Sequence, residues 1–169
     1  MVFKLKEWEP SDAKDLAAAL SNKKVLDNLR DGPPFPYTEK DALDYINSVS
    51  SADKSKCFAY AVEADGKVVG SVGVFRKENI HFRTAELGYY LSEDYWNRGI
   101  MTEAVKLLCE KVFSESDIIR IFAEPFTHNT GSCRVLEKCG FLKEGVMKKN
   151  AFKNGKVCDM ALYALTKEE

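Results

Sequence analysis

The part of the sequence that most limits the possible folds is a strand, a turn, a helix and a second strand in direct succession. Residues 84–91 and 118–126 are apolar segments of strand length. Between them, apolar residues recur every four positions, as on one face of a helix. These residues are Ile100, Ala104, Leu108 and Val112. Because a helix that crosses between two strands of one sheet makes a right-handed connection, we expect these strands to be parallel neighbours.

The rest of the sequence alternates between short strands and helices. Asp65-Gly66 and Asn154-Gly155 are typical of β-hairpin turns. Three prolines exclude a helix over residues 31–37, because proline lacks an N–H donor and favours extended geometry in the preceding residue. The expected strands are residues 2–8, 57–63, 68–76, 84–91, 118–126 and the two arms of the final hairpin. The expected helices follow Pro10, span 25–29, start at the capping pair Thr38 and Asp41, begin near Gly99, and span 130–139.

This order of elements predicts an α+β fold, a mixed sheet with helices on both faces, rather than a Rossmann fold. The 169 residues are enough for one domain, 1–169, and the 45% of hydrophobic residues supply its core. The formal net charge of -1 gives no general attraction to nucleic acid or to an anionic membrane. Neither is expected as a partner, and an anionic ligand would have to be held locally.

The cysteines argue against both a disulfide framework and a zinc site. Their number is odd, they form no CxxC pair, and no histidine cluster accompanies them. They are Cys57, Cys109, Cys133, Cys139 and Cys158. The first residues lack the apolar core of a signal peptide, and no run approaches the roughly 18 apolar residues of a membrane span. We therefore expect reduced thiols, no metal and a cytoplasmic location.

Two segments carry the chemistry, residues 86–104 and 128–141. In the first, Gly99 lies at a strand-to-helix turn, where the N–H groups of the first helical turn converge and favour an anion such as a diphosphate. A glycine before a helix is also an ordinary turn residue. The second segment reads His128-Asn-Thr-Gly-Ser-Cys-Arg-Val-Leu-Glu-Lys-Cys-Gly-Phe141 and follows the next expected strand.

Together these segments resemble the GNAT superfamily of acyl-CoA-dependent N-acyltransferases, most closely its RimJ/RimL-like branch. The resemblance covers nearly the whole chain. Its other matching segments are residues 5–12, 70–73 and 144–145. The resemblance implies a largely antiparallel seven-stranded sheet with one splayed parallel strand pair, acetyl-CoA as cosubstrate, and a primary amine as acceptor.

In such a fold the pantetheine arm lies in a V-shaped opening between the strand ending at Leu91 and the strand ending near Phe126. Unpaired backbone groups, including those of Tyr90 and Leu91, would bind its amides as a neighbouring strand does. A bulge at Gly88 would force the two strands apart. The family's diphosphate loop corresponds to Arg98, Gly99, Ile100, Met101 and Thr102, whose N–H groups would hold the phosphates. This loop departs from the commonest pattern, with Trp96 three residues before the glycine and Met101 two after it.

Glu86 is our candidate for the base that removes a proton from the acceptor amine. It is the charged residue of an otherwise apolar strand, and partial burial is expected to raise its pKa. In the family, an acidic residue on this strand is often the base. A structural carboxylate, or one that binds the substrate ammonium, explains Glu86 equally well. Glu124, on the next strand, is the second candidate.

Ser132 matches the family's proton donor to the departing thiolate, although a serine there also suits a helix cap. Many relatives place a tyrosine in this helix where the chain has Leu136, and RimL-like enzymes carry a glutamate where it has Ala151. Asn129 is expected to bind the pantetheine amides, to cap the helix, or both.

Phe35 and Tyr37 lie in the proline-rich loop and are expected to be exposed and to line the acceptor pocket. A hydrophobic plug at the sheet edge is the alternative. The sequence does not distinguish a protein N-terminus from a small amine as acceptor, and it leaves the oligomeric state open, a homodimer included. The alternative function is a non-catalytic acyl-CoA-binding sensor.

Overall fold

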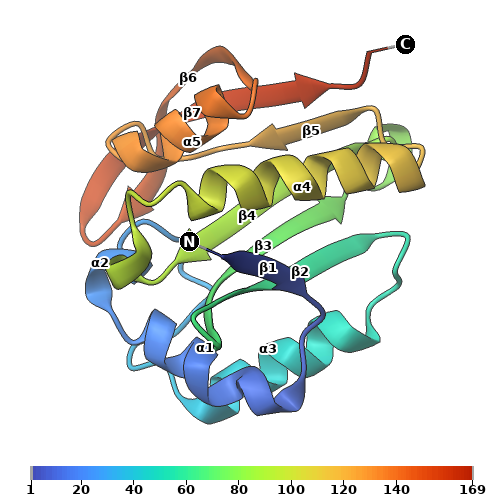
Figure 1. The fold of residues 1–169 in the computed structure, drawn as a ribbon. Coiled ribbons are helices and arrows are strands. Elements are labelled where there is room, and N and C mark those ends of the chain that lie inside the picture. Colours follow the sequence, from blue (N-terminus) through green and yellow to red (C-terminus); the bar gives the residue numbers. More distant parts are fainter. Residues whose placement is uncertain (1, 169) are drawn as a thin grey trace.

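A mixed seven-stranded sheet runs through the molecule in the order β1-β2-β3-β4-β5-β7-β6 (Figure 1). The computed structural model describes residues 2–168. The strands are β1 (Phe3–Lys6), β2 (Cys57–Ala64), β3 (Lys67–Arg76), β4 (Thr84–Leu91), β5 (Arg120–Ala123), β6 (Leu142–Lys153) and β7 (Lys156–Thr166). The helices are α1 (Ala13–Leu20), α2 (Lys23–Leu26), α3 (Glu39–Ser51), α4 (Ile100–Glu115) and α5 (Thr130–Lys138). Short 3-10 turns are η1 (Pro10–Asp12), η2 (Asn79–His81) and η3 (Glu93–Tyr95).

The parallel pair expected from the sequence is confirmed. β4 and β5 are parallel and joined by α4, whereas every other pair of neighbouring strands is antiparallel. The four apolar residues that predicted the helix are all buried in α4. The structure is therefore the expected α+β fold, with one parallel pair in a largely antiparallel sheet.

Two hydrophobic cores lie on opposite faces of the sheet. One core packs α4 and α5 against the sheet and includes Leu87 and Leu91 of β4. The other lies under α1 and α3, which contact each other (Figure 1). Because side chains alternate along a strand, Glu86, Gly88 and Tyr90 belong to this second face. β4 thus presents different groups to the two sides of the molecule.

Local turn and cap signals are confirmed. Asp65 and Gly66 have positive φ values of 52° and 74°, and Asn154 and Gly155 of 52° and 76°, as a type I′ hairpin turn requires. The side chain of Thr38 accepts a hydrogen bond from the Asp41 N–H at the start of α3. These signals depend on residues close together in the chain.

Several expected boundaries are wrong. The first strand ends at Lys6 rather than residue 8, and the second short helix is α2, capped by Asn22, rather than residues 25–29. The strand expected over 118–126 is reduced to β5, which ends at Ala123. Pro125 follows, and since it lacks an N–H it cannot donate to a strand ladder. Phe126 then makes an isolated bridge with Met160 of β7.

The expected bulge at Gly88 is also wrong. β3 and β4 pair in unbroken register from Gly70 with Leu91 to Arg76 with Ala85, and Gly88 lies opposite Gly73. The parallel neighbours therefore separate because β5 turns away toward β7, and not because β4 is distorted.

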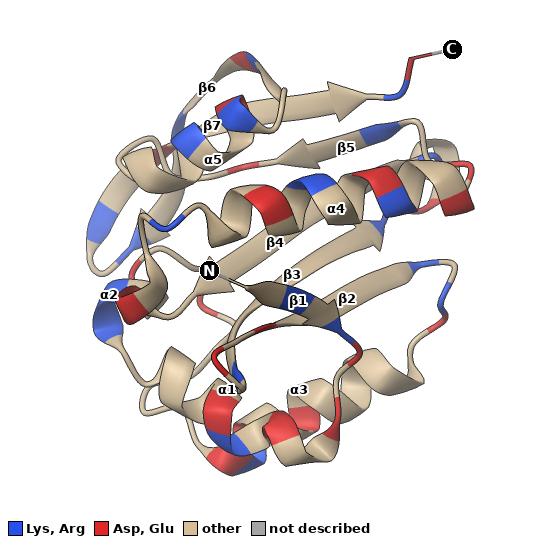
Figure 2. Cartoon of the chain, in the orientation of Figure 1, with Lys and Arg blue, Asp and Glu red and all other residues tan. Residues whose placement is uncertain are grey.

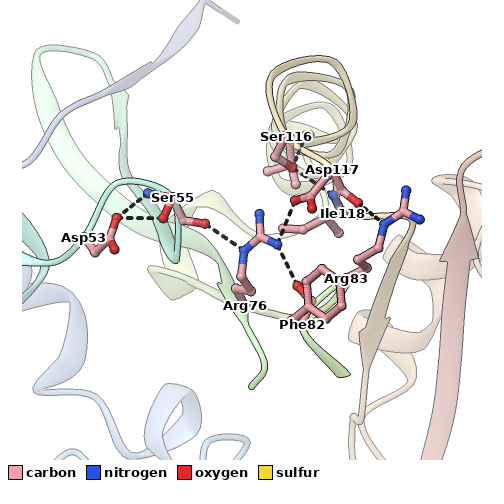
Figure 3. Close-up of polar contacts among 9 residues, drawn as sticks. Asp53, Ser55, Arg76, Phe82, Arg83, Ser116, Asp117 and Ile118 are labelled. Carbon is pink, nitrogen blue, oxygen red and sulfur yellow. Dashed lines mark hydrogen bonds and ion pairs between the residues drawn. The ribbon is translucent and has the colours of Figure 1, made fainter. Parts of the chain in front are cut away.

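Arg76 connects the chain segments around the N-terminal end of β4 (Figure 3). Its guanidinium donates to the carbonyl oxygens of Ser55 at 2.8 Å and Phe82 at 2.6 Å, and it pairs with the Asp117 carboxylate at 2.8 Å. Arg83 donates to the carbonyl oxygen of Asp117 at 2.8 Å. These contacts hold the end of α4 beside the start of β4.

Charge is distributed without a single dominant sign. Figure 2 shows acidic and basic residues interspersed along α1, α3 and α4. This agrees with the net charge of -1. In the described part of the chain, no helix combines the length and the apolar character that crossing a membrane requires.

Candidate active site

The separation of β4 from β5 creates an unpaired strand edge in the middle of the sheet. The two strands pair over only three positions, Thr84 with Arg120, Ala85 with Ile121 and Glu86 with Phe122. β4 continues to Leu91, and no strand within residues 2–168 pairs with this edge beyond Glu86. Backbone amides at such an edge can bind an extended molecule that carries amide groups.

The N-terminus of α4 forms an anion site beside this edge. Gly99 has a φ of 77°, a left-handed conformation that suits glycine, and it begins the helix without a side-chain cap. The first N–H groups of a helix have no intrahelical acceptor. They face a pocket of about 420 Å³. Its lining residues are Phe3, Arg98, Gly99, Ile100, Thr102, Glu103, Lys106 and Lys138.

Most of the predicted diphosphate loop is thus gathered in one place, with two additional lysines from α4 and α5. Met101 differs from the rest, because its side chain is buried in the core and only its backbone can serve a ligand. Trp96, which precedes the predicted loop, donates its indole N–H to the Leu91 carbonyl oxygen at 2.7 Å. That bond ties the loop to the end of β4.

Tyr89 and Ser132 form a hydroxyl pair that links β4 to α5. Their side-chain oxygens lie 2.7 Å apart, and the Tyr89 hydroxyl also donates to the Ser132 carbonyl oxygen at 3.0 Å. Because a phenol has one proton, the Ser132 hydroxyl then donates to the Tyr89 oxygen. Burial raises the pKa of Tyr89, so the phenol stays neutral. Asn129 caps α5 by accepting the Ser132 N–H at 3.2 Å, as one sequence interpretation required.

Glu86 lies on the opposite face, in a pocket of about 440 Å³ between β4, β5 and the β6–β7 hairpin. Its side chain is 18% exposed, which confirms the expected partial burial. Arg30 pairs with Glu86, and the same guanidinium nitrogen lies 3.5 Å from Glu124. Lys77 lies 3.8 Å from Glu86. Two cations therefore lie close to the Glu86 carboxylate, and the two candidate bases share one arginine.

The two aromatic residues predicted to line an acceptor pocket, Phe35 and Tyr37, are absent from the lining of the pocket around Glu86. Phe35 is exposed as expected. Tyr37, expected to be exposed, is instead buried in the core under α1 and α3, where burial raises its pKa to about 12. The side chain of Tyr90 packs against this same core, so only its backbone is available to a cofactor in the gap.

Sequence reasoning missed the residues that shape the pocket around Glu86. Arg30 and Asp31 come from the loop before α3, and Lys153 comes from the last hairpin. The apolar lining consists of Phe122, Phe126, Ala151, Phe152 and Met160. No local signal marks these residues, because they meet only when distant segments fold together. Ala151 lies in this lining, where RimL-like enzymes were expected to carry a glutamate.

The comparison with known protein families decides the identity of the fold. The family described as the acetyltransferase (GNAT) domain matches residues 3–142. The chain is a GNAT acetyltransferase. The RimJ/RimL resemblance seen in the sequence is confirmed by the ribosomal-protein-serine acetyltransferase of Escherichia coli, which is 26% identical over 144 residues, 85% of this chain and 80% of that relative.

Individual relatives agree with this assignment. The probable N-acetyltransferase YjcK of Bacillus subtilis is 40% identical over 103 residues, a match that spans 61% of this chain and 57% of that relative. The uncharacterized N-acetyltransferase YoaA of Bacillus subtilis is 34% identical, with 96% of this chain and 92% of YoaA covered. The structure of RimL, a ribosomal L7/L12 alpha-N-protein acetyltransferase in complex with coenzyme A, has a TM-score of 0.87 at 23% identity and covers 98% of this chain and 94% of RimL. At this identity the likeness concerns the fold.

The site of this GNAT acetyltransferase fits coenzyme A. The uncapped start of α4 supplies N–H donors for a diphosphate, Lys106 and Lys138 add positive charge beside it, and the free edge of β4 matches an amide-bearing arm. Among the described residues, no group of three or more His, Cys, Asp or Glu side chains is arranged to hold a metal ion.

Proposed function

We propose that the protein transfers the acetyl group of acetyl-CoA to a primary amine, by direct attack of the bound amine on the thioester. The observation that carries this proposal is the gap between β4 and β5, which has a carboxylate on one face and a hydroxyl pair on the other. An amine approaching Glu86 and a thioester beside Ser132 would meet at this gap.

The cofactor's polar groups would be held by the backbone. The N–H groups of residues 98–102, aided by the Thr102 hydroxyl, bind the diphosphate, and the backbone of Tyr90 and Leu91 binds the pantetheine amides. The Asn129 amide, which already caps α5, contributes its N–H donors. Acetyl-CoA, when bound, supplies the activated acetyl group.

Glu86 would accept a proton from the acceptor, directly or through a water molecule. An ammonium group has no lone pair, so the proton must leave before the nitrogen attacks. Glu86 belongs to the paired part of the sheet, next to the point where the gap opens, and its position is well fixed. Glu124 follows the end of β5 and is the second candidate.

Ser132 would donate a proton to the departing thiolate. Its hydroxyl is hydrogen-bonded to Tyr89, whose O–H can turn from the Ser132 carbonyl oxygen to the serine oxygen and stabilise that oxygen once its proton has left. Tyr89 would therefore assist in the proton donation that the sequence assigns to Ser132 alone. The signal for it was a tyrosine three residues after Glu86 on the alternate face of the strand.

The acceptor is a primary amine, either a protein N-terminus, as the name of RimL states for that enzyme, or a small molecule. We place the reaction in the cytoplasm, where the five free thiols stay reduced.

The test is thiol release from acetyl-CoA over a panel of small amines and peptides with free N-termini. We expect release with at least one acceptor, and a fall of about 10²-fold or more in kcat for Glu86→Gln. Glu124→Gln decides between the two carboxylates. Glu78→Gln, which changes an exposed glutamate that pairs with Lys56, is the control. Tight acetyl-CoA binding without release under any condition would instead identify a non-catalytic acyl-CoA sensor.

A further inference from the structure

Arg30 contacts the two candidate bases, Glu86 and Glu124, from a segment that is held in place by the β6–β7 hairpin. We call residues 27–31, between α2 and α3, the strap. Asp31 pairs with Lys153 at 2.7 Å, and Asp27 accepts a hydrogen bond from the Asn154 side chain at 2.9 Å. The Lys153 side chain is only 12% exposed. The strap is thereby anchored to the tip of the β6–β7 hairpin across the pocket.

The guanidinium of Arg30 bridges the two walls of the pocket. One of its nitrogens contacts Glu86, at the last paired position of β4, and lies 3.5 Å from Glu124, just beyond the end of β5. An acceptor amine that gives its proton to Glu86 must approach the same carboxylate while still an ammonium. Two cations cannot occupy one position, so Arg30 and the acceptor compete for it.

We propose that Arg30 is a specificity-determining residue, whose guanidinium holds the place of the acceptor's ammonium group between Glu86 and Glu124. This inference rests on the proposed function and adds the class of acceptor. An acceptor binds productively by displacing the Arg30 guanidinium. Its charge and polarity must therefore match the pocket that remains after Arg30 has moved.

Charge balance defines one part of that match. Three cations and three carboxylates line the pocket, so its net charge is zero with Arg30 in place. The cations are Arg30, Lys77 and Lys153, and the carboxylates are Asp31, Glu86 and Glu124. Withdrawal of Arg30 leaves a net charge of -1, which one ammonium neutralises. A carboxylate next to the acceptor amine would cancel the charge of the ammonium, so that the pocket would not be neutralised.

The uncharged part of the lining defines the other part. Beside the carboxylates lie the rings of Phe122, Phe126 and Phe152 and the side chain of Met160. Such a surface favours apolar atoms next to the ammonium. The expected acceptor is therefore a primary amine on an apolar or uncharged chain.

The structure makes displacement of Arg30 easy. Its side chain is 63% exposed, and exposed ion pairs contribute little to stability. The anchors of the strap involve Asp27 and Asp31 rather than Arg30, so the strap remains in place when the guanidinium moves.

The experiment measures peptide binding to the protein saturated with coenzyme A, by calorimetry. The probes are Met-Leu-Gly amide, whose only charge is its N-terminal ammonium, and Met-Asp-Gly amide. For Arg30→Gln we expect the Kd of Met-Leu-Gly amide to fall by about three- to tenfold, since the competing cation no longer lowers the binding-competent fraction. The Kd of Met-Asp-Gly amide should fall by a smaller factor. Arg30→Lys, which keeps a cation on the strap, should stay near the wild type.

The matched control is Lys40→Gln, which removes a cation from an exposed i,i+4 pair on α3. An equal gain in this control, or unchanged, weaker or undetectable binding of Met-Leu-Gly amide to Arg30→Gln, overturns the proposal. Weaker binding of Met-Asp-Gly amide alone would show that Arg30 binds anions, which also overturns it. Because the readout is binding, absence of acetyl transfer beside tighter peptide binding would count against the proposed function only. Retained coenzyme A affinity shows that each variant is folded.

Discussion

The two ends of the β4–β5 pair differ in how they are held. At the closed end, the strands pair from Thr84 to Glu86, and Arg76 connects three further segments through the groups in Figure 3. At the open end, β5 stops at Ala123, and the bridge between Phe126 and Met160 draws the chain toward β7. The closed end satisfies its polar groups within the protein, whereas the open end leaves a strand edge for a ligand.

The difference shows that the gap depends on structure on both sides of it. A strand edge in the centre of a sheet would tend to pair if the neighbouring strand were free to do so. Beyond the end of β5, the chain does not pair with β4, because Pro125 lacks an N–H donor and Phe126 pairs with β7 instead. At the closed end, the two strands stay in register. We propose that the chemistry takes place where the gap opens, next to Glu86, and that the closed end stabilises the fold.

The largest effect is expected at the open end. Ser132→Ala should lower kcat by about 10²-fold, because the thiolate loses its proton donor, with little change in the KM for acetyl-CoA. Tyr89→Phe should lower kcat less, since Ser132 remains. Steady-state kinetics measure both, with Ser114→Ala, an exposed serine near the end of α4, as control. An unchanged kcat for Ser132→Ala would exclude it as the donor.

At the closed end, the expected loss is in stability. Arg76→Ala removes the partner of two carbonyl oxygens and one carboxylate, and the arginine side chain is only 13% exposed. We expect the free energy of unfolding to fall by about 2 kcal/mol, measured by urea denaturation. Lys14→Ala, on the exposed face of α1, is the control. A large loss of kcat in the folded variant would contradict the division between the two ends.

Two glycine variants separate backbone strain from ligand binding. Gly99→Ala and Gly66→Ala place a side chain at φ values of 77° and 74°, where an added Cβ meets no atom within 4 Å. Each should lose about 1 kcal/mol of stability through backbone strain alone. Only Gly99→Ala should also weaken coenzyme A binding, by about fivefold. Equal coenzyme A affinity in the two variants would argue against the N-terminus of α4 as the diphosphate site.

The smallest effect is the pH dependence of the closed end. The hydrogen bond from Arg76 and its charge lower the pKa of Asp117 below its usual 3.8. A depressed pKa means that this carboxylate stabilises the fold above about pH 4, and that its contribution is lost as pH falls through the folded-state pKa. In urea denaturation between pH 7 and pH 3, the wild type should lose its advantage over Asp117→Asn at the acid end. A constant difference would assign no role to the ionised form.

Much of the fold could be predicted because its signals are local. The bounds of β4 agree with the expected residues 84–91, and both hairpin turns follow from dipeptides that tolerate positive φ. The end of β5 was harder, because the apolar sequence continues past Ala123 although the strand does not. Strand length there is decided by the competing pairing of Phe126 with β7.

The candidate site was predicted only in part. Glu86, Ser132 and Asn129 could be named from motifs and the family resemblance, but their partners could not. Arg30 and Glu86 are 56 residues apart, and Tyr89 and Ser132 are 43 apart, so no local pattern connects them. The expected exposure of Tyr37 was wrong for a similar reason. This loop residue is buried because it enters the core that α1 and α3 form.

The sequence by itself determined the turns, the caps, the helical faces and the family, since each depends on residues within a few positions or on a motif read in order. The tertiary structure alone decided that β5 leaves β4, that Tyr89 joins Ser132, and that the strap carries Arg30 onto two carboxylates. The physical reason is that these contacts join segments whose separation is set by the assembled sheet, and their free energies exist only once it has formed.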